Sequence, residues 1–385
     1  MRKEVDYFYI RFLIFFSITL VVLINIKAGL QLSSDAYTYI SWSQRLIESD
    51  FSLAKFHENS DQLFIYYLYD GFLFYIASLQ LLFGHNWLDV FFGLNLLFLS
   101  ITFLYFFSLI GYSSNTFKTN LFAVFLIFLA LDFFLWPHFL LTEGIFIFLL
   151  TSFLFFYSRQ FFIDLSINKK KNYLFISLVF LILAFFTKPG SLGIVMGILF
   201  FSLVNLLKFN EKKTKIFLLI LVCFSPILFQ VLFSLMPTLE SEKFSQLSGY
   251  ITNGVVIHDR ESTYLDSINS SPSQVFLFRF LYFFIPIVPE MSLFHKLVDS
   301  LFSILLLLSI ILWLLYSGSY TYRHRIVCQL MLFMFIFSGL FHSATLIDYD
   351  WRYRFSSLIP MIIFITYNFI ELSIKNYDRN NNSSI

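Results

Sequence analysis

Long apolar runs, separated by short polar segments, repeat along almost the whole chain. A helix that crosses a membrane needs about 20 apolar residues, and ten segments reach or approach that length. They are residues 7–30, 88–112, 121–141, 145–162, 173–186, 191–207, 216–236, 297–316, 326–346 and 356–374. The pattern predicts an all-α polytopic membrane protein with about ten transmembrane helices, folded as a single membrane domain over residues 1–385.

Two further apolar stretches, residues 63–84 and 275–289, are ambiguous. The first is long enough to span but contains Asp70, and the second is short and contains Arg279 and two prolines. If both lie on the outer surface, the basic clusters fall on the opposite side, as the positive-inside rule requires of cytoplasmic loops. These clusters are Arg2-Lys3, Lys118, Lys169-Lys170-Lys171, Lys208 with Lys212-Lys213-Lys215, Arg323 with Arg325, and Lys375 with Arg379.

This assignment defines two outer loops. Residues 31–86 form the first, with juxtamembrane helices that include 63–84, and residues 237–296 form the second. Both termini, including the tail 376–385, are then expected in the cytoplasm.

Composition supports a membrane protein and excludes other classes. The chain is 58% hydrophobic and only 13% charged, far from the values of soluble domains. A net charge of +2 gives no reason to expect a nucleic-acid partner. The two cysteines lie inside apolar runs, so a disulfide framework is not expected. The 56 phenylalanines fit a chain encoded by an AT-rich bacterial genome. In a bacterium, a multi-pass protein of this kind is expected in the inner or plasma membrane, in contact with membrane lipids.

Two acidic motifs stand at predicted outer ends of spans. Asp35 follows the first span, where a carboxylate beside apolar surface suits a general base. Alternatively, Ser34 or Asp35 caps the helix that follows. Glu143 lies in the turn between the third and fourth spans, and its alternative role is that of an acidic partner for a helix N-terminus. Asp132 lies deeper, where packing or hydrogen bonding fits it better than chemistry.

Two basic motifs break the charge rule at the same face. Lys188 ends the fifth span, where either an anionic ligand or a snorkelling side chain explains it. Arg352 and Arg354 lie among aromatic residues just before the last span. Guanidinium groups suit phosphate because they offer a planar fork of donors, although arginines in an interfacial aromatic belt are the alternative.

The order and sidedness of these motifs resemble the GT-C superfamily of membrane glycosyltransferases, which use polyprenyl-phosphate sugars. The bacterial relatives of protein O-mannosyltransferases and of lipid A aminoarabinose transferases are the most similar. The motifs are Ser34-Asp35-Ala36-Tyr37, Thr142-Glu143, Thr187-Lys188-Pro189 and Arg352-Tyr353. One departure is that Gln62-Leu63-Phe64 stands where family members often have His-Pro-Pro or Pro-Pro.

The resemblance implies a reaction and residue roles. A sugar would pass, with inversion, from a polyprenyl-phosphate donor to an envelope glycan, lipid or protein acceptor at the outer face. No cofactor is expected, and a divalent ion shared by the two acidic motifs is not favoured. Asp35 would take the acceptor proton, Glu143 would orient hydroxyls, Lys188, Arg352 and Arg354 would neutralise the leaving phosphate, and Tyr37 and Tyr353 would contact substrate.

Three other functions stay open. An O-antigen polymerase or ligase would place catalytic arginines in the second outer loop, where Arg260 and Arg279 are the candidates. A transporter or flippase for lipid-linked sugars would show internal repeats and polar helices at the midplane. A non-enzymatic assembly scaffold is the third alternative, but that function would not explain why Lys188 and Arg352 lie at the outer face.

Overall fold

The computed structural model describes residues 2–58, 64–113, 116–162, 166–235, 271–286, 292–345 and 354–382. Within these ranges every regular element is a helix, and the only β-like contact is an isolated bridge between Gln31 and Phe139. The prediction of an all-α protein is therefore confirmed for the part of the chain that the structure describes.

A helix lies over each of the ten predicted spans. These helices are α1 (Arg2–Ala28), α5 (Trp87–Ser113), α6 (Phe117–Leu129), α8 (Glu143–Phe162), α9 (Ile167–Phe185), α10 (Ser191–Leu206), α11 (Glu211–Leu235), α14 (Leu293–Tyr316), α15 (Tyr322–Thr345) and α16 (Phe355–Asn382). In the described ranges, six candidate spans are long and apolar enough to cross a membrane, or seven with one bent pair included. The protein is thus a multi-pass membrane protein, and the number ten stays a prediction.

Shorter helices connect these long ones. They are α2 (Ser34–Glu48), α3 (Leu53–Glu58), η1 (Phe64–Tyr69), α4 (Asp70–Phe83), η2 (Gly84–Asn86), α7 (Asp132–Leu135), η3 (Trp136–His138), α13 (Pro272–Phe284) and η5 (Ser317–Ser319). The expected continuous span over 121–141 is wrong, because α6 ends at Leu129 and the chain turns by 67° into α7 and η3. The predicted tail is partly helical, since α16 continues to Asn382.

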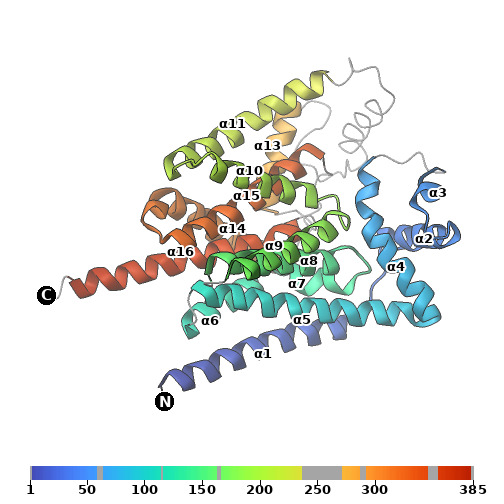
Figure 1. Ribbon diagram of the computed structural model, residues 1–385, viewed down its shortest axis with the longest axis horizontal. Coiled ribbons are helices and arrows are strands. Elements are labelled where there is room, and N and C mark those ends of the chain that lie inside the picture. Colours follow the sequence, from blue (N-terminus) through green and yellow to red (C-terminus); the bar gives the residue numbers. More distant parts are fainter. Residues whose placement is uncertain are drawn as a thin grey trace.

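Helix α4 lies across the bundle. By composition, Tyr67–Tyr112 forms one apolar stretch, yet Figure 1 shows α4 running steeply across the direction of α5. Its 14 residues reach only about 21 Å, less than the roughly 30 Å of a hydrocarbon core. Phe72, Leu73 and Ile76 are buried in the cluster that α4 shares with α2. This arrangement fits the interfacial helix predicted within residues 63–84.

Helix α15 is the centre of the bundle and packs closely on α10. In its span 83% of the residues are buried, against 17% in the span of α1. A Cβ atom added at Gly193 would lie 2.7 Å from the Ser338 Cα atom, and one at Gly197 would lie 2.6 Å from the Phe333 carbonyl oxygen. Small residues thus let the two backbones approach. Helix α13 packs against α15 and α11.

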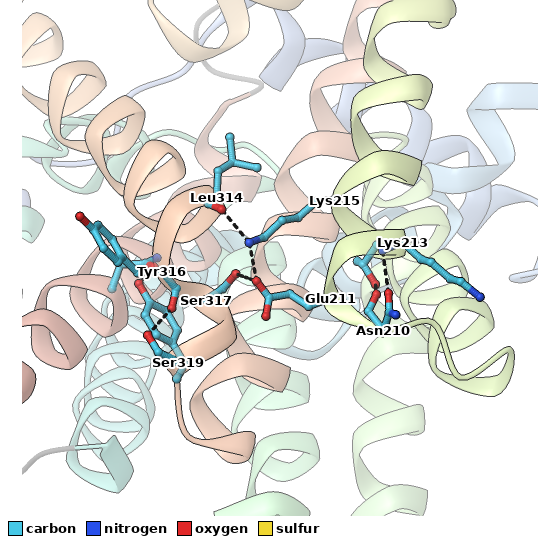
Figure 2. A network of polar contacts seen from close by, with 11 residues as sticks. Asn210, Glu211, Lys213, Lys215, Leu314, Tyr316, Ser317 and Ser319 are labelled. Carbon is cyan, nitrogen blue, oxygen red and sulfur yellow. Dashed lines mark hydrogen bonds and ion pairs between the residues drawn. The ribbon is translucent and has the colours of Figure 1, made fainter.

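The two ends of the bundle differ. Figure 1 shows the start of α1 and the end of α16 on one side, which we call the terminal end, and α2, α3 and α4 on the other, which we call the α4 end. A polar latch at the terminal end joins α11 to α14 (Figure 2). Ser317 Oγ donates to Glu211 Oε1 at 2.6 Å, while Lys215 pairs with the same carboxylate and donates to the Leu314 carbonyl at 2.6 Å.

Candidate functional site

At the α4 end, the segment after α1 lies beside the segment before α8. The Gln31 N–H donates to the His138 carbonyl at 2.9 Å, and the Leu140 N–H donates to the Gln31 carbonyl at 3.1 Å. Asn25 Nδ2 also donates to the Phe133 carbonyl at 3.3 Å. The segments that lead into the two acidic motifs are therefore held side by side.

The start of α4 lies against the loop between α9 and α10. The Gly71 N–H donates to the Phe186 carbonyl at 2.8 Å. A Cβ atom at position 71 would lie only 2.7 Å from that carbonyl oxygen, so the contact requires glycine. The loop that carries Lys188 is thereby attached to the juxtamembrane helix.

Lys188 and Glu143 form a buried ion pair. The distance from Lys188 Nζ to Glu143 Oε1 is 2.6 Å, and each side chain is 2% exposed. Thr142 Oγ1 donates to the second carboxylate oxygen at 3.2 Å. A lysine that snorkels reaches toward water, whereas this one is enclosed. Glu143 is also the first residue of α8, so its alternative role at a helix N-terminus is compatible with the pairing.

A buried histidine lies within electrostatic range of Lys188 and of a second cation. Arg279 on α13 and His342 near the end of α15 are each 3% exposed. The His342 ring packs against Phe283 with centroids 5.4 Å apart and lies within electrostatic range of both Arg279 and Lys188. Sequence reasoning considered Arg279 only for a polymerase or ligase and missed His342. The available signal was an arginine inside an otherwise apolar segment.

Arg354 occupies a different cluster. Its Nη2 atom donates to Asp299 Oδ1 at 2.7 Å and to Asp132 Oδ2 at 3.2 Å, and all three side chains are at most 1% exposed. Trp136 Nε1 donates to Asp132 Oδ1 at 2.8 Å. The guanidinium also lies 5.5 Å from the centre of the Phe302 ring. Asp132 thus has the hydrogen-bonding role that its depth suggested.

The charges in this cluster favour the ionised arginine. Burial alone would lower the pKa of the Arg354 guanidinium, but the carboxylates of Asp132 and Asp299 outweigh it, and the net shift of the pKa is upward. The cluster joins α7, α14 and the start of α16. Asp299 was missed from the sequence, although an aspartate inside an apolar run was a usable signal.

Asp35 lies half-buried in the first turn of α2. The cap of that helix is Ser33, whose hydroxyl accepts a hydrogen bond from the Ala36 N–H at 3.3 Å, so the expected capping by Ser34 or Asp35 is wrong. Tyr37, on the same helix, is 63% exposed. Arg352 and Tyr353 lie outside the described residues, as does Arg260.

Neither a metal site nor a comparison with known proteins adds to this description of the site. Within the described ranges no group of three or more His, Cys, Asp or Glu side chains could hold a metal ion. No family model, curated protein or solved structure matches the chain. The site therefore consists of two buried ionic clusters and a half-buried carboxylate in an all-helical membrane protein.

Proposed function

We propose that the protein is an integral membrane glycosyltransferase that moves a sugar from a polyprenyl-phosphate donor to an envelope glycan, lipid or protein acceptor. The observation that carries the proposal is that buried His342 lies within electrostatic range of both Arg279 and Lys188, the lysine that pairs with Glu143 at the α4 end. Two buried cations from separate elements therefore act on one buried histidine. A lipid-linked phosphate is an anion that reaches such a site from the membrane.

The phosphate of the donor would be stabilised by Lys188 and Arg279. Charge develops on the phosphate oxygens as the bond to the sugar breaks, and fixed cations in a water-poor site stabilise it strongly. An ammonium group has three donors, so Lys188 can keep its 2.6 Å contact with Glu143 and still reach a phosphate oxygen. Glu143 would orient that lysine and substrate hydroxyls.

Arg354 has a structural role in this proposal. Two carboxylates bond its single guanidinium, so an approaching phosphate would meet negative surroundings. The phosphate contacts expected from Arg354 are therefore reassigned to Arg279. Arg352 keeps the role that the sequence predicts for it.

Asp35 would act as the general base. The acceptor oxygen attacks the anomeric carbon from the face opposite the phosphate, and the acceptor proton passes to the Asp35 carboxylate. A new carbon–oxygen bond forms to the acceptor, the bond to the phosphate oxygen breaks, and polyprenyl phosphate leaves with the electron pair. Inversion at the anomeric carbon follows. Tyr37, whose side chain is exposed, would contact the substrates, and Tyr353 keeps the substrate contact that the sequence predicts for it.

The orientation follows from the basic residues. Because Lys169, Lys212 and Arg323 begin helices that start at the terminal end, that end would face the cytoplasm of a bacterium. The reaction would then take place at the outer face of the inner or plasma membrane.

A deletion strain tests the proposal. Mass spectrometry would measure polyprenyl-phosphate sugars and envelope glycans after complementation with wild type, Asp35→Asn, Arg279→Gln, or the control Arg323→Gln, whose side chain is exposed at the terminal end. We expect loss of one glycan modification and accumulation of its lipid-phosphate sugar, rescued only by wild type and the control. Unchanged glycans in the deletion strain would refute glycosyl transfer, and rescue by Asp35→Asn would refute the base.

A polymerase or ligase is the second candidate, because Arg279, buried within electrostatic range of His342, is one of the arginines that such an enzyme would use. The same spectra separate the two functions. Loss of a polymerase shortens the glycan, and loss of a ligase leaves finished glycan on its lipid carrier. Neither change accumulates a single sugar on polyprenyl phosphate.

A further inference from the structure

A second buried pair lies at the α4 end, between α3 and the start of α4. His57 Nε2 lies 3.1 Å from Asp70 Oδ1 and 3.2 Å from Asp70 Oδ2, and the two side chains are 7% and 9% exposed. The Tyr67 ring stacks on the imidazole with centroids 3.9 Å apart, and Phe56 meets its edge at 4.8 Å. The carboxylate and both aromatic rings therefore hold the imidazole in one place.

This pair is connected to Lys188 by a short path. Asp70 is followed by Gly71, whose N–H donates to the Phe186 carbonyl at 2.8 Å. Lys188 lies two residues after Phe186 in the sequence, and its side chain pairs with Glu143. A buried polar pair gives little net stability by itself, so its position between α3 and α4 needs another reason.

We infer that His57 and Asp70 are positioning residues for Lys188. The pair fixes the first turn of α4, and through Gly71 that turn fixes the loop that presents Lys188 to the donor phosphate. The inference rests on the proposed function and extends it to residues that do not touch the donor. Sequence reasoning used Asp70 only as a sign of an interfacial helix and did not consider His57.

Gly71 offers a way to disturb this path without touching the pair. A Cβ atom at position 71 would lie 2.7 Å from the Phe186 carbonyl oxygen and 3.1 Å from its Cβ atom. Relief of that contact requires a shift of roughly 0.5–1 Å. Gly93 on α5 is a matched control, because a Cβ atom there would meet nothing within 4 Å.

Steady-state kinetics on the purified protein in nanodiscs test the inference. The donor would be polyprenyl-phosphate sugar, with kcat and KM measured separately and folding checked by thermal unfolding. Gly71→Ala, Asp70→Asn and His57→Ala should each lower kcat/KM for the donor about tenfold or more, mainly through kcat. Lys188 would stabilise charge that develops on the phosphate during the reaction, and a displacement near 1 Å costs a positioned group much of its effect. His57→Gln should restore most of the loss, since its amide nitrogen can replace Nε2 as the donor to Asp70. Gly93→Ala should match wild type.

The outcomes separate the inference from the proposed function. An unchanged kcat/KM for the donor in folded Gly71→Ala and His57→Ala would overturn the positioning role. If His57→Ala does not fold, the kinetics of Gly71→Ala and His57→Gln test the positioning role in its place. If wild type transfers no sugar, the proposed function fails, and the affinity of the same variants for polyprenyl phosphate alone still decides the positioning role, an equal affinity in all of them refuting it.

Discussion

Replacement of Arg354 by methionine is the most direct test of the buried charges. The substitution leaves the carboxylates of Asp132 and Asp299, which are 0% and 1% exposed, without the cation that both contact through Nη2. Removing one partner of a buried ion pair costs about 3–5 kcal/mol. We therefore expect the unfolding temperature to fall by roughly 10 °C, using the usual conversion for domains above 150 residues.

Compensating substitutions separate charge from packing. Asn at both Asp132 and Asp299, combined with Arg354→Met, removes every formal charge and should recover most of the lost stability, because neutral replacement of buried ions is often harmless. Asp299→Asn alone with Arg354→Met should recover only part. Arg323→Met is the control, since this arginine is exposed and donates to the Phe162 carbonyl at 3.2 Å, and its effect should stay within about 0.5 kcal/mol.

The assay is thermal unfolding of each purified variant in the same detergent or nanodisc, together with its affinity for polyprenyl phosphate. A decrease in stability that the triple variant reverses would establish Arg354 as a structural cation. The contrary result is a fully stable Arg354→Met protein that has lost its affinity for polyprenyl phosphate. That result would return Arg354 to the phosphate-binding role that the sequence suggested.

Three further substitutions have expected outcomes. Ser33→Ala should weaken hydrogen-exchange protection of α2 by about 1 kcal/mol through loss of its cap, whereas Asp35→Asn should leave that protection unchanged and abolish transfer. Gly197→Ala should lower thermal stability by about 1–3 kcal/mol, because the new Cβ atom would lie 2.6 Å from the Phe333 carbonyl oxygen. Glu211→Gln should cost about 1 kcal/mol, measured by thermal unfolding, because the terminal-end latch loses its charged acceptor.

Each of these has a matched control and a contrary result. Gly93→Ala controls for the helical glycine, and equal stability of Gly197→Ala and Gly93→Ala would contradict the close packing of α10 on α15. Lys213→Gln, at an exposed residue near the latch, controls for Glu211→Gln. Loss of α2 protection in Asp35→Asn would mean that Asp35 supports the helix rather than the reaction.

The helices could be predicted because their lengths depend on local counts of apolar residues. The predicted span over 121–141 is not one continuous helix, and a contact beside the break is non-local. Asp132 contacts Arg354, a residue 222 positions later, and the chain bends at Ala130 where α6 ends. No local pattern carries that contact.

In the candidate site, too, single residues could be predicted from local sequence, whereas their contacts could not. Lys188 and Glu143 could each be selected from the sequence, because a charge at the end of an apolar run is costly. Their pairing could not, since it depends on how α8 meets the loop before α10. The nearness of His342 to Lys188 likewise depends on Gly193, which lets α10 approach α15.

Lys188 and Arg354 look alike in sequence, because both are basic residues that break the charge rule at the same predicted face. Their surroundings separate them. Arg354 bonds two carboxylates, so the cluster repels an anion, whereas Lys188 pairs with Glu143 and lies near a histidine that a second cation, Arg279, also influences. In a medium of low dielectric constant such differences in net charge act strongly on an approaching anion. We therefore expect a lipid-linked phosphate to bind beside Lys188, and the role that we infer for His57 and Asp70 is to position that lysine.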